Sequence, residues 1–279
     1  MISQQVSMVL PTTISTTQFT AIVYDYYAKN KRDFAWRRDI DAYRVVVSEV
    51  MLQQTQTHRV EKKFDSFITA FPSFEALARA PLREVLAQWQ GLGYNRRALA
   101  LQKIAQKVVE EYGGVLPDDP GVLVTFPGIG PATAASICAF AGNKPTLFIE
   151  TNIRAVFIHF FFQGRDKVTD KEIFPLVEKT VDTKNPREWY YALMDYGVML
   201  KKKMPNPSRR SAHHIQQSKF EGSERQIRGM IVKMLTQHSP LSYGQLVQLV
   251  DKEPQRVKKN LSALCAEGLV KKQGDVFTC

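Results

Sequence analysis

Residues 123–136 of the 279-residue chain read LVTFPGIGPATAAS, and this stretch decides how the whole sequence is interpreted. Its pattern predicts a helix, a tight turn and a second helix, because Pro127 ends the first helix and Gly128 and Gly130 supply the dihedral angles of a sharp turn. Pro131 suits the first position of the second helix. The unpaired N–H groups at that helix start would seat a phosphate. An ordinary connection between two helices fits the same pattern.

A second informative segment, residues 147–156, reads LFIETNIRAV. An apolar run ends at Glu150, and a helix is predicted to start directly after it. Together the two segments resemble the helix-hairpin-helix plus Gly/Pro-Asp signature of a DNA glycosylase superfamily. The resemblance implies that the hairpin binds a DNA phosphate. It also implies that the residue at 150, an aspartate in that superfamily, faces the extruded nucleotide.

The composition is that of a soluble globular protein, with 44% hydrophobic and 23% charged residues. The net charge of +11 favours a polyanionic partner. No apolar run approaches the ~18 residues that a membrane helix needs, and no secretory signal is visible, so we expect a cytoplasmic, nucleoid-associated protein without a membrane partner. Three cysteines, Cys138, Cys265 and Cys279, lie far apart in the chain. They predict reduced thiols, no disulfide and no metal site.

Residues 41–56, DAYRVVVSEVMLQQTQ, contain a candidate acid. At helical spacing Glu49 lies between Val45 and Val46, so its carboxyl group is expected to be partly desolvated. Desolvation favours the protonated form, which suits a group that delivers a proton near neutral pH. A glutamate at the rim of a buried helix, reaching solvent, is the alternative interpretation.

Two further motifs suit contact with DNA. The amides of Gln53 and Gln54 would hydrogen-bond base edges, although a polar helix end also explains them. Residues 91–98, GLGYNRRA, predict a tight turn that presents Tyr94 at the start of a basic helix. Beside Arg96, an aromatic ring suits base stacking and phosphate contact. The alternative is a tyrosine that fills a helix junction.

The remainder of residues 18–200 predicts helices with few strand signals. Residues 1–17 are expected to form a flexible arm, residues 34–38 a basic and aromatic loop, and residues 201–214 a basic loop or linker whose contact with phosphates is left open. The predicted helices are 18–29, 60–71, 74–80, 82–89, 99–112, 152–162, 170–181 and 186–200.

The C-terminal stretch predicts three helices and a hairpin. Ser223 with Gln226 and Ser242 with Gln245 fit capping boxes, and Pro254 opens the third helix. Residues 269–270 and 276–277 are the predicted hairpin strands.

This order of elements resembles a winged helix-turn-helix domain, whose third helix commonly enters the major groove. Arg256, Lys258 and Lys259 on that helix are the candidate DNA contacts. A winged helix that binds protein is the alternative.

Residues 19–200 resemble the adenine-specific mismatch glycosylase family, MutY. The resemblance implies an all-α, two-lobed helix-hairpin-helix glycosylase fold over residues 18–220, followed by a winged-helix DNA-binding domain over 221–279. The central lobe would span about 41–141, and the second lobe 18–40 plus 142–220. The segments that carry the resemblance are SEVMLQQTQ at 48–56, GLGY at 91–94, PGIG at 127–130 and MDYG at 194–197.

The family's catalytic roles transfer to matching positions. The resemblance implies that Glu49 protonates the flipped adenine at N7, that Asn152 helps to orient the site, and that residue 150 stabilises the cationic sugar. Glu150 departs from the family's aspartate by one methylene, and a small displacement can cost much rate.

The family's DNA contacts transfer in the same way. Gln54 would hydrogen-bond in the opened duplex, Tyr94 would wedge beside the opposite base, and the backbone of Gly128 and Gly130 would hold a phosphate.

Three further departures bear on function. Ala132 stands where lyase-competent relatives have a lysine, so we expect a monofunctional enzyme. Lys201 stands where the family's iron–sulfur segment has its first cysteine, so we expect no cluster. We expect the winged helix to take the place of the family's usual C-terminal domain, which reads 8-oxoguanine opposite the adenine.

The sequence therefore predicts a monomeric glycosylase that acts on double-stranded DNA and removes a mismatched base, adenine opposite guanine or 8-oxoguanine. Removal of thymine or uracil opposite guanine is one alternative. A catalytically weak DNA-binding or regulatory protein is the other.

Overall fold

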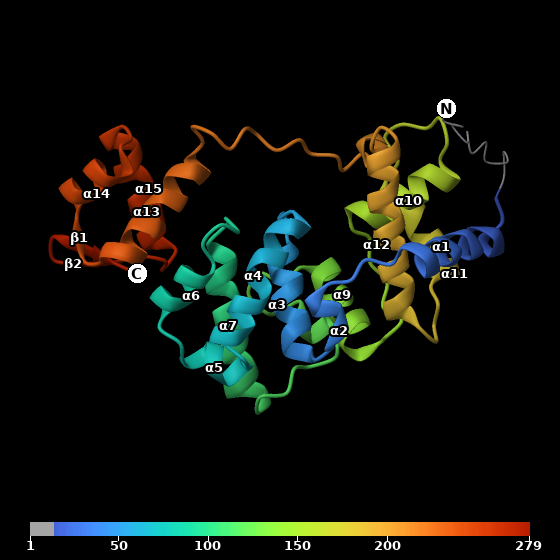
Figure 1. Cartoon of the computed structure of the whole chain (residues 1–279), viewed down its shortest axis with the longest axis horizontal. Helices are drawn as coiled ribbons and strands as arrows, with labels where there is room; N and C mark the ends of the chain where they lie inside the picture. Colours follow the sequence, from blue (N-terminus) through green and yellow to red (C-terminus); the bar gives the residue numbers. More distant parts are fainter. Residues whose placement is uncertain (1–13) are drawn as a thin grey trace, which may run out of the picture. The chain divides into compact units, whose positions relative to one another are not determined.

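The computed structural model describes residues 14–279, whose helices and strands are labelled in Figure 1. The described chain is mainly helical, as predicted. It divides into two compact units, and each unit is built from two separate stretches of sequence. The first unit combines residues 14–33 with Cys138–Gln216, and the second combines Phe34–Ile137 with Gln217–Cys279.

The helices of the first unit assemble around buried aromatic rings. Phe19 of α1 lies 5.2 Å from Phe157 of α10 and 5.8 Å from Trp189 of α12, measured between ring centroids. Burial of such large apolar side chains is the main force that holds these helices together. The elements are α1 (Thr16–Asn30), α10 (Thr151–Phe161), α11 (Asp170–Thr180), α12 (Pro186–Lys203) and the 3-10 helix η1 (Pro207–Arg210).

Two predictions for this unit need correction. Residues 1–13 of the predicted arm lie outside the described residues, but Ser15 forms a capping box with Gln18 and α1 already begins at Thr16. The basic segment predicted as a loop from residue 201 is partly helical, because α12 continues to Lys203 and η1 follows. Arg210 at the end of η1 donates to the carbonyl oxygen of Phe162 at 2.9 Å.

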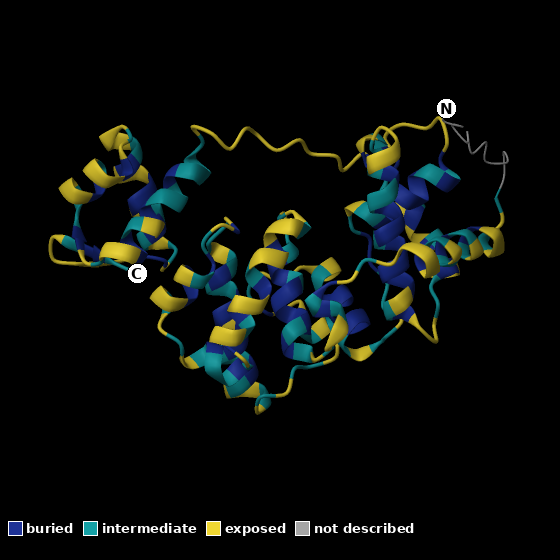
Figure 2. Cartoon of the chain, viewed as in Figure 1, coloured by how far each residue is buried: buried dark blue, intermediate teal, exposed yellow. Residues whose placement is uncertain are grey.

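The second unit contains the helices on either side of the predicted hairpin, and their inward faces are buried (Figure 2). Trp36, predicted to lie in a loop, belongs to a short helix and stacks on Phe34 with ring centroids 4.7 Å apart. The helices are α2 (Ala35–Arg38), α3 (Ala42–Leu52), α4 (Thr57–Ala70), α5 (Phe74–Arg79), α6 (Leu82–Gln88), α7 (Arg96–Tyr112), α8 (Pro120–Leu123) and α9 (Pro131–Gly142), which continues into the first unit.

The hairpin that decides the fold lies between α8 and α9. Gly128 has a φ of +75°, and a Cβ atom there would lie 3.0 Å from the Cβ of Ala100, so this position requires glycine. Gly130 has neither a positive φ nor a crowded Cβ position. The expectation that both glycines supply special dihedral angles is therefore wrong for Gly130.

The C-terminal region, residues 217–279, has the three predicted helices and a small antiparallel sheet. The sheet order is β1-β3-β2, with Leu241 opposite Phe277. The predicted hairpin is present, although its first strand starts at Lys271 rather than at residue 269. The elements are α13 (Glu224–His238), β1 (Leu241–Ser242), α14 (Tyr243–Val250), α15 (Pro254–Ala266), β2 (Lys271–Gln273) and β3 (Val276–Thr278).

The two predicted helix caps in this region differ in outcome. Ser242 and Gln245 form the expected capping box at the start of α14. Ser223 caps α13 by accepting from the N–H of Gln226. The Gln226 side chain, however, accepts from the N–H of Gly222 and donates to Glu221, so this end is not a capping box.

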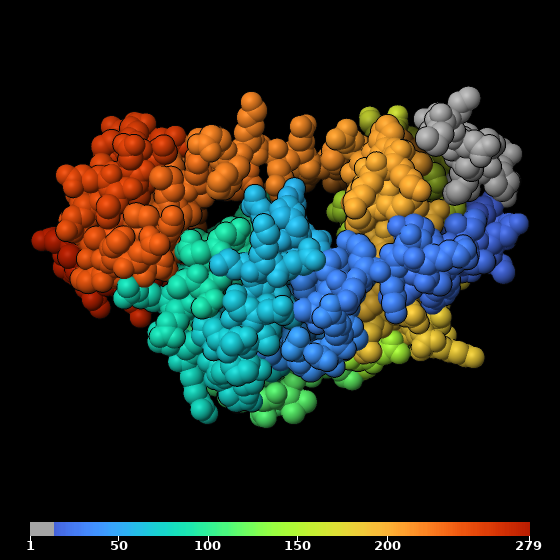
Figure 3. Space-filling model, viewed as in Figure 1, coloured from blue at the N-terminus to red at the C-terminus, as the bar shows by residue number. Residues whose placement is uncertain are grey.

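Residues 212–222 are exposed throughout (Figure 2), and their side chains stand out singly from the backbone in the space-filling view of Figure 3. The segment carries the chain from the first unit into the second. None of the helices described within residues 14–279 combines the length and the apolar character that crossing a membrane requires.

Candidate active site

Glu49 lies on α3 at the edge of an apolar face. Its neighbours Val46 and Val50 are buried, whereas Glu49 itself is partly exposed, as the helical spacing predicted. The hydroxyl of Ser136 on α9 donates to Oε2 of Glu49 at 2.5 Å. This contact fixes the direction of the carboxyl group from a second helix. Sequence reasoning singled out Glu49 but gave Ser136 no role.

The end of α3 is joined to the hairpin through Gln53. Its Nε2 donates to the carbonyl oxygen of Gly128 at 3.2 Å and lies 3.3 Å from Oγ1 of Thr133. The Gln53 amide is therefore engaged within the protein. Gln54 is exposed and has a φ of +52°, so of the two predicted amides it is the one presented to solvent.

The turn that carries Tyr94 is strongly constrained. Gly93 has a φ of +71° and Tyr94 itself has a φ of +49°, which is unusual for a residue with a side chain. The indole N–H of Trp89 donates to the carbonyl oxygen of Gly93 at 3.0 Å. The turn thus places the Tyr94 ring in a defined position at the start of α7.

One partly buried guanidinium, that of Arg97, connects this turn to α3. Its Nη1 donates to the carbonyl oxygens of Val50 and Met51, each at 2.8 Å, and its Nη2 donates to Oγ1 of Thr55 at 2.8 Å. The group satisfies carbonyls that would otherwise be unpaired at the end of α3. Burial lowers the pKa of Arg97 to about 10. Its position in a basic cluster gave no sign of this structural role.

The predicted cations of the second unit are in different situations. Arg96 pairs with Glu267 at 3.1 Å. Arg256 donates through Nε to Glu224 at 2.9 Å. Lys258 and Lys259 are exposed on α15. Arg96 and the two lysines are therefore exposed to solvent, whereas Arg256 is partly covered beside Glu224.

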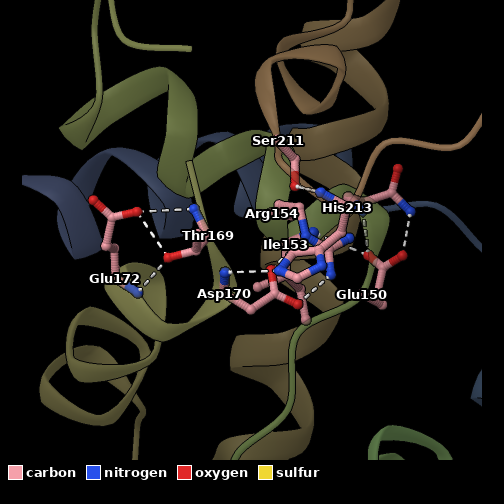
Figure 4. Close-up of polar contacts among 9 residues, drawn as sticks. Glu150, Ile153, Arg154, Thr169, Asp170, Glu172, Ser211 and His213 are labelled. Carbon is pink, nitrogen blue, oxygen red and sulfur yellow. Dashed lines mark hydrogen bonds and ion pairs between the residues drawn. The ribbon is translucent and has the colours of Figure 1, made fainter. Parts of the chain in front are cut away.

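Glu150 lies in the first unit at the start of α10 (Figure 4), and Asn152 is a residue of the first turn of that helix. Oε1 of Glu150 accepts from the backbone N–H groups of Asn152 at 2.7 Å and Ile153 at 3.0 Å. Oε2 accepts from the Asn152 amide at 3.2 Å. Glu150 is thus the N-cap of α10, where the helix dipole favours a negative charge.

Lys201 of α12 also contacts the Glu150–Asn152 pair. Its ammonium group donates to Oδ1 of Asn152 at 2.7 Å. Burial lowers the pKa of Lys201, while the nearby Glu150 carboxylate raises it. Gly197 lets the helices approach, since a Cβ there would lie 2.6 Å from the carbonyl oxygen of Asn152. The sequence marked Lys201 only as a missing cysteine and did not reveal this contact.

The residues present do not fit an iron–sulfur cluster of the four-cysteine type. Such a cluster needs about four thiolate ligands. The chain has three cysteines, and Cys138 lies in a different unit from Cys265 and Cys279. Within residues 14–279 there is no group of three or more His, Cys, Asp or Glu side chains arranged to hold a metal ion.

Comparison with known proteins gives one consistent picture. Residues 47–181 match the model of the HhH-GPD superfamily base excision DNA repair protein family. The adenine DNA glycosylase of Mycolicibacterium smegmatis is 31% identical over 271 residues, covering 90% of this chain and 92% of that protein. The human adenine DNA glycosylase is 36% identical over 194 residues, covering 65% of this chain and 36% of that protein.

Among solved structures, a thermostable thymine-DNA glycosylase superposes with a TM-score of 0.61. It is 25% identical to this chain, and the match covers 69% of this chain and 90% of the other. The two-lobed glycosylase fold expected from the sequence agrees with this similarity.

Proposed function

Because the chain belongs to the adenine DNA glycosylase family of the HhH-GPD superfamily, we propose that it hydrolyses the N-glycosidic bond of a mismatched adenine opposite guanine or 8-oxoguanine. The observation that carries the proposal is Glu49. It stands within the matched residues 47–181, at the edge of an apolar face, with its carboxyl group held by Ser136.

The chemistry assigns separate tasks to the two carboxyl groups. An adenine must leave the base stack before its glycosidic bond is accessible. Glu49 then protonates the extruded base at N7 and makes it a better leaving group. Glu150 supplies negative charge to stabilise the cationic sugar that forms as the bond breaks, and Asn152 orients that carboxylate. Water completes the hydrolysis.

The reaction stops at the abasic site. Strand cleavage by a bifunctional glycosylase needs an amine that forms a Schiff base with the sugar. Ala132, in the first turn of α9, offers only a methyl group. The enzyme is therefore monofunctional.

The proposed partner is double-stranded DNA, bound by a monomer at the nucleoid. The exposed Gln54 hydrogen-bonds in the opened duplex, Tyr94 enters the stack, and the backbone of Gly128 and Gly130 holds a phosphate. Lys258 and Lys259 on α15 add phosphate contacts. The chain works without a cofactor, which the three scattered cysteines support.

The second candidate is removal of thymine or uracil opposite guanine. The similarity to a thymine-DNA glycosylase favours it, since the match covers 69% of this chain. The reaction class would be unchanged, because protonation and sugar stabilisation serve any base that leaves. The difference would lie in the residues that contact the extruded base.

Single-turnover base release on a panel of duplexes tests the proposal. The panel holds adenine opposite guanine or 8-oxoguanine and thymine or uracil opposite guanine, each with and without alkali. We expect adenine release that becomes a strand break only after alkali. Glu49→Gln should lower the rate by about 100-fold or more and leave DNA binding intact, since only the proton donor is lost.

Glu61→Gln is the matched control, because Glu61 is an exposed glutamate on α4 of the same unit. It should release adenine at the rate of the unmodified protein. Release of thymine or uracil instead of adenine would replace the proposed substrate by the second candidate. DNA binding without release of any base would refute the proposed enzymatic activity and would favour the interpretation as a DNA-binding protein.

A further inference from the structure

Two guanidinium groups lie close to the Tyr94 ring. The Cζ atom of Arg97 is 5.5 Å from the ring centroid, and that of Arg225 is 5.6 Å from it. Nη1 of Arg225 also donates to the Tyr94 hydroxyl at 2.6 Å. Arg225 therefore contacts Tyr94 at the end of the side chain that is farthest from the backbone.

The two arginines hold different parts of the structure. Nη1 of Arg97 donates to carbonyls of α3, and Nη2 donates to the carbonyl oxygens of Leu92 and Gly93, so Arg97 fixes the turn to α3. Arg225 belongs to α13, and its Nη2 donates to the carbonyl oxygen of Ser218 at 2.7 Å. Its other terminal nitrogen, Nη1, donates to the tyrosine hydroxyl. Arg225, which belongs to the C-terminal region, thus supports the tyrosine side chain.

Other contacts within the same unit hold α13 in place. Nε of Arg83 on α6 donates to the carbonyl oxygen of Thr236 on α13 at 2.9 Å. Glu267, beyond α15, pairs with both Arg96 and Arg228. These contacts bind the C-terminal region to α6 and α7, so the position of Arg225 does not depend on its own side chain alone.

We propose that Arg225 is a positioning residue for Tyr94, through which the C-terminal region takes part in base extrusion. A tyrosine whose hydroxyl and ring are already held loses less side-chain entropy when it enters the DNA stack. The inference rests on the proposed function, because Tyr94 is taken to enter the duplex. Arg225 acts on extrusion of the base and leaves bond cleavage to Glu49 and Glu150.

Base extrusion is measured without catalysis in the full-length Glu49→Gln protein. A duplex carries adenine opposite guanine with 2-aminopurine beside the adenine, and its fluorescence rises when the neighbouring base leaves the stack. We expect Arg225→Met to lower the extruded fraction by about tenfold, the loss typical of one charge-assisted hydrogen bond. Tyr94→Phe, which keeps the ring and removes the hydroxyl, should give a similar loss.

A double-mutant cycle identifies the contact itself. The variant with both Arg225→Met and Tyr94→Phe should extrude no less than the worse single variant, because either change removes the same hydrogen bond. Additive losses would overturn the inference. If Arg225→Met does not fold, the Tyr94→Phe variant alone tests the inference. An unchanged extruded fraction in Tyr94→Phe would overturn the inference too.

Arg228→Met is the matched control. Arg228 lies one helical turn further along α13 and pairs with Glu267, so the change weakens the region without contact with Tyr94. It should leave extrusion unchanged, and a loss equal to that of Arg225→Met would overturn the inference. Failure of the proposed function shows separately, as absence of adenine release by the protein with Glu49 intact.

Discussion

At the scale of single residues, Glu150 stands where the resemblance to the family implies an aspartate. Its carboxylate accepts from two backbone N–H groups of α10 and from the Asn152 amide. The longer side chain thus folds back onto the start of its own helix. This arrangement keeps a negative charge at the helix start, which is the property that the proposed sugar stabilisation requires.

Replacement of Glu150 separates its charge from its capping role. Glu150→Gln keeps an acceptor for the helix N–H groups but removes the charge, so we expect single-turnover adenine release to slow by about 100-fold. Glu150→Asp keeps both charge and cap and should stay within about tenfold of the unmodified rate.

Glu178→Gln serves as the control for this pair, because Glu178 is an exposed glutamate on α11 of the same unit. It should not change the rate. An unaltered rate in Glu150→Gln would show that this carboxylate has no part in the chemistry.

Glu49, Glu150 and Asn152 are candidates from the sequence, but it did not reveal the groups that hold them. Motif spacing is local, whereas these contacts join distant parts of the chain. Ser136 is 87 residues from Glu49, and Lys201 is 49 residues from Asn152. Arg225 and Tyr94 are 131 residues apart. Nothing in hydrophobic period or helix capping connects positions so far apart.

At the scale of elements, periodicity and capping residues located the long helices well. The predicted helix 170–181 corresponds to α11, Asp170–Thr180, and 186–200 to α12, Pro186–Lys203. The errors fall on short elements, since α2 has 4 residues and β1 has 2. Such short segments are set by tertiary packing rather than by their own propensity, so sequence alone does not reveal them.

The packing of α12 against α10 gives an element-scale prediction. A Cβ atom at position 197 would lie 2.6 Å from the Asn152 carbonyl oxygen, so Gly197→Ala must push the two helices apart. We expect the free energy of unfolding to fall by about 1–3 kcal/mol, as for overpacked cores. Urea denaturation followed by circular dichroism measures the change.

Gly229→Ala in α13 is the matched control. Nothing lies within 4 Å of a Cβ built at that position, and the residue is helical. Alanine there should raise the free energy of unfolding by up to about 1 kcal/mol, the difference in helix propensity. Equal stability of the unmodified protein and Gly197→Ala would show that the two helices adjust without cost.

At the scale of the whole molecule, the number of cysteines predicts a protein that contains no iron. Four thiolates on one cluster are not available from three cysteines, and Lys201 uses its ammonium group to hold Asn152. The purified protein should be colourless and contain no stoichiometric iron. An iron chelator should leave its Tm unchanged, because no ligand bound to the native state is removed.

A brown preparation with bound iron, or a Tm that falls on addition of the chelator, would contradict this expectation. Measurement of the Tm in excess zinc is a useful comparison. A thiol site that binds metal adventitiously would change the Tm when metal is added and also when metal is removed.

The grouping of the helices into lobes was predicted only from the resemblance to a known family. Periodicity shows where helices lie, but it carries no information on which of them share a core. The expectation that the N-terminal helix joins a lobe formed far along the chain rests on that resemblance alone. The domain boundaries at residues 41, 141 and 220 stay a prediction.

The discontinuity of both units has a consequence for synthesis on the ribosome. α1 is made before the other described elements, yet Phe19 packs on Trp189 and Tyr24 hydrogen-bonds to Asp182. It must therefore wait for most of the chain before its apolar face is covered. The second unit is completed only by residues 217–279, which emerge after residues 34–137 of the same unit. Until these later segments emerge, the nascent chain exposes hydrophobic surface and so presents binding sites for chaperones.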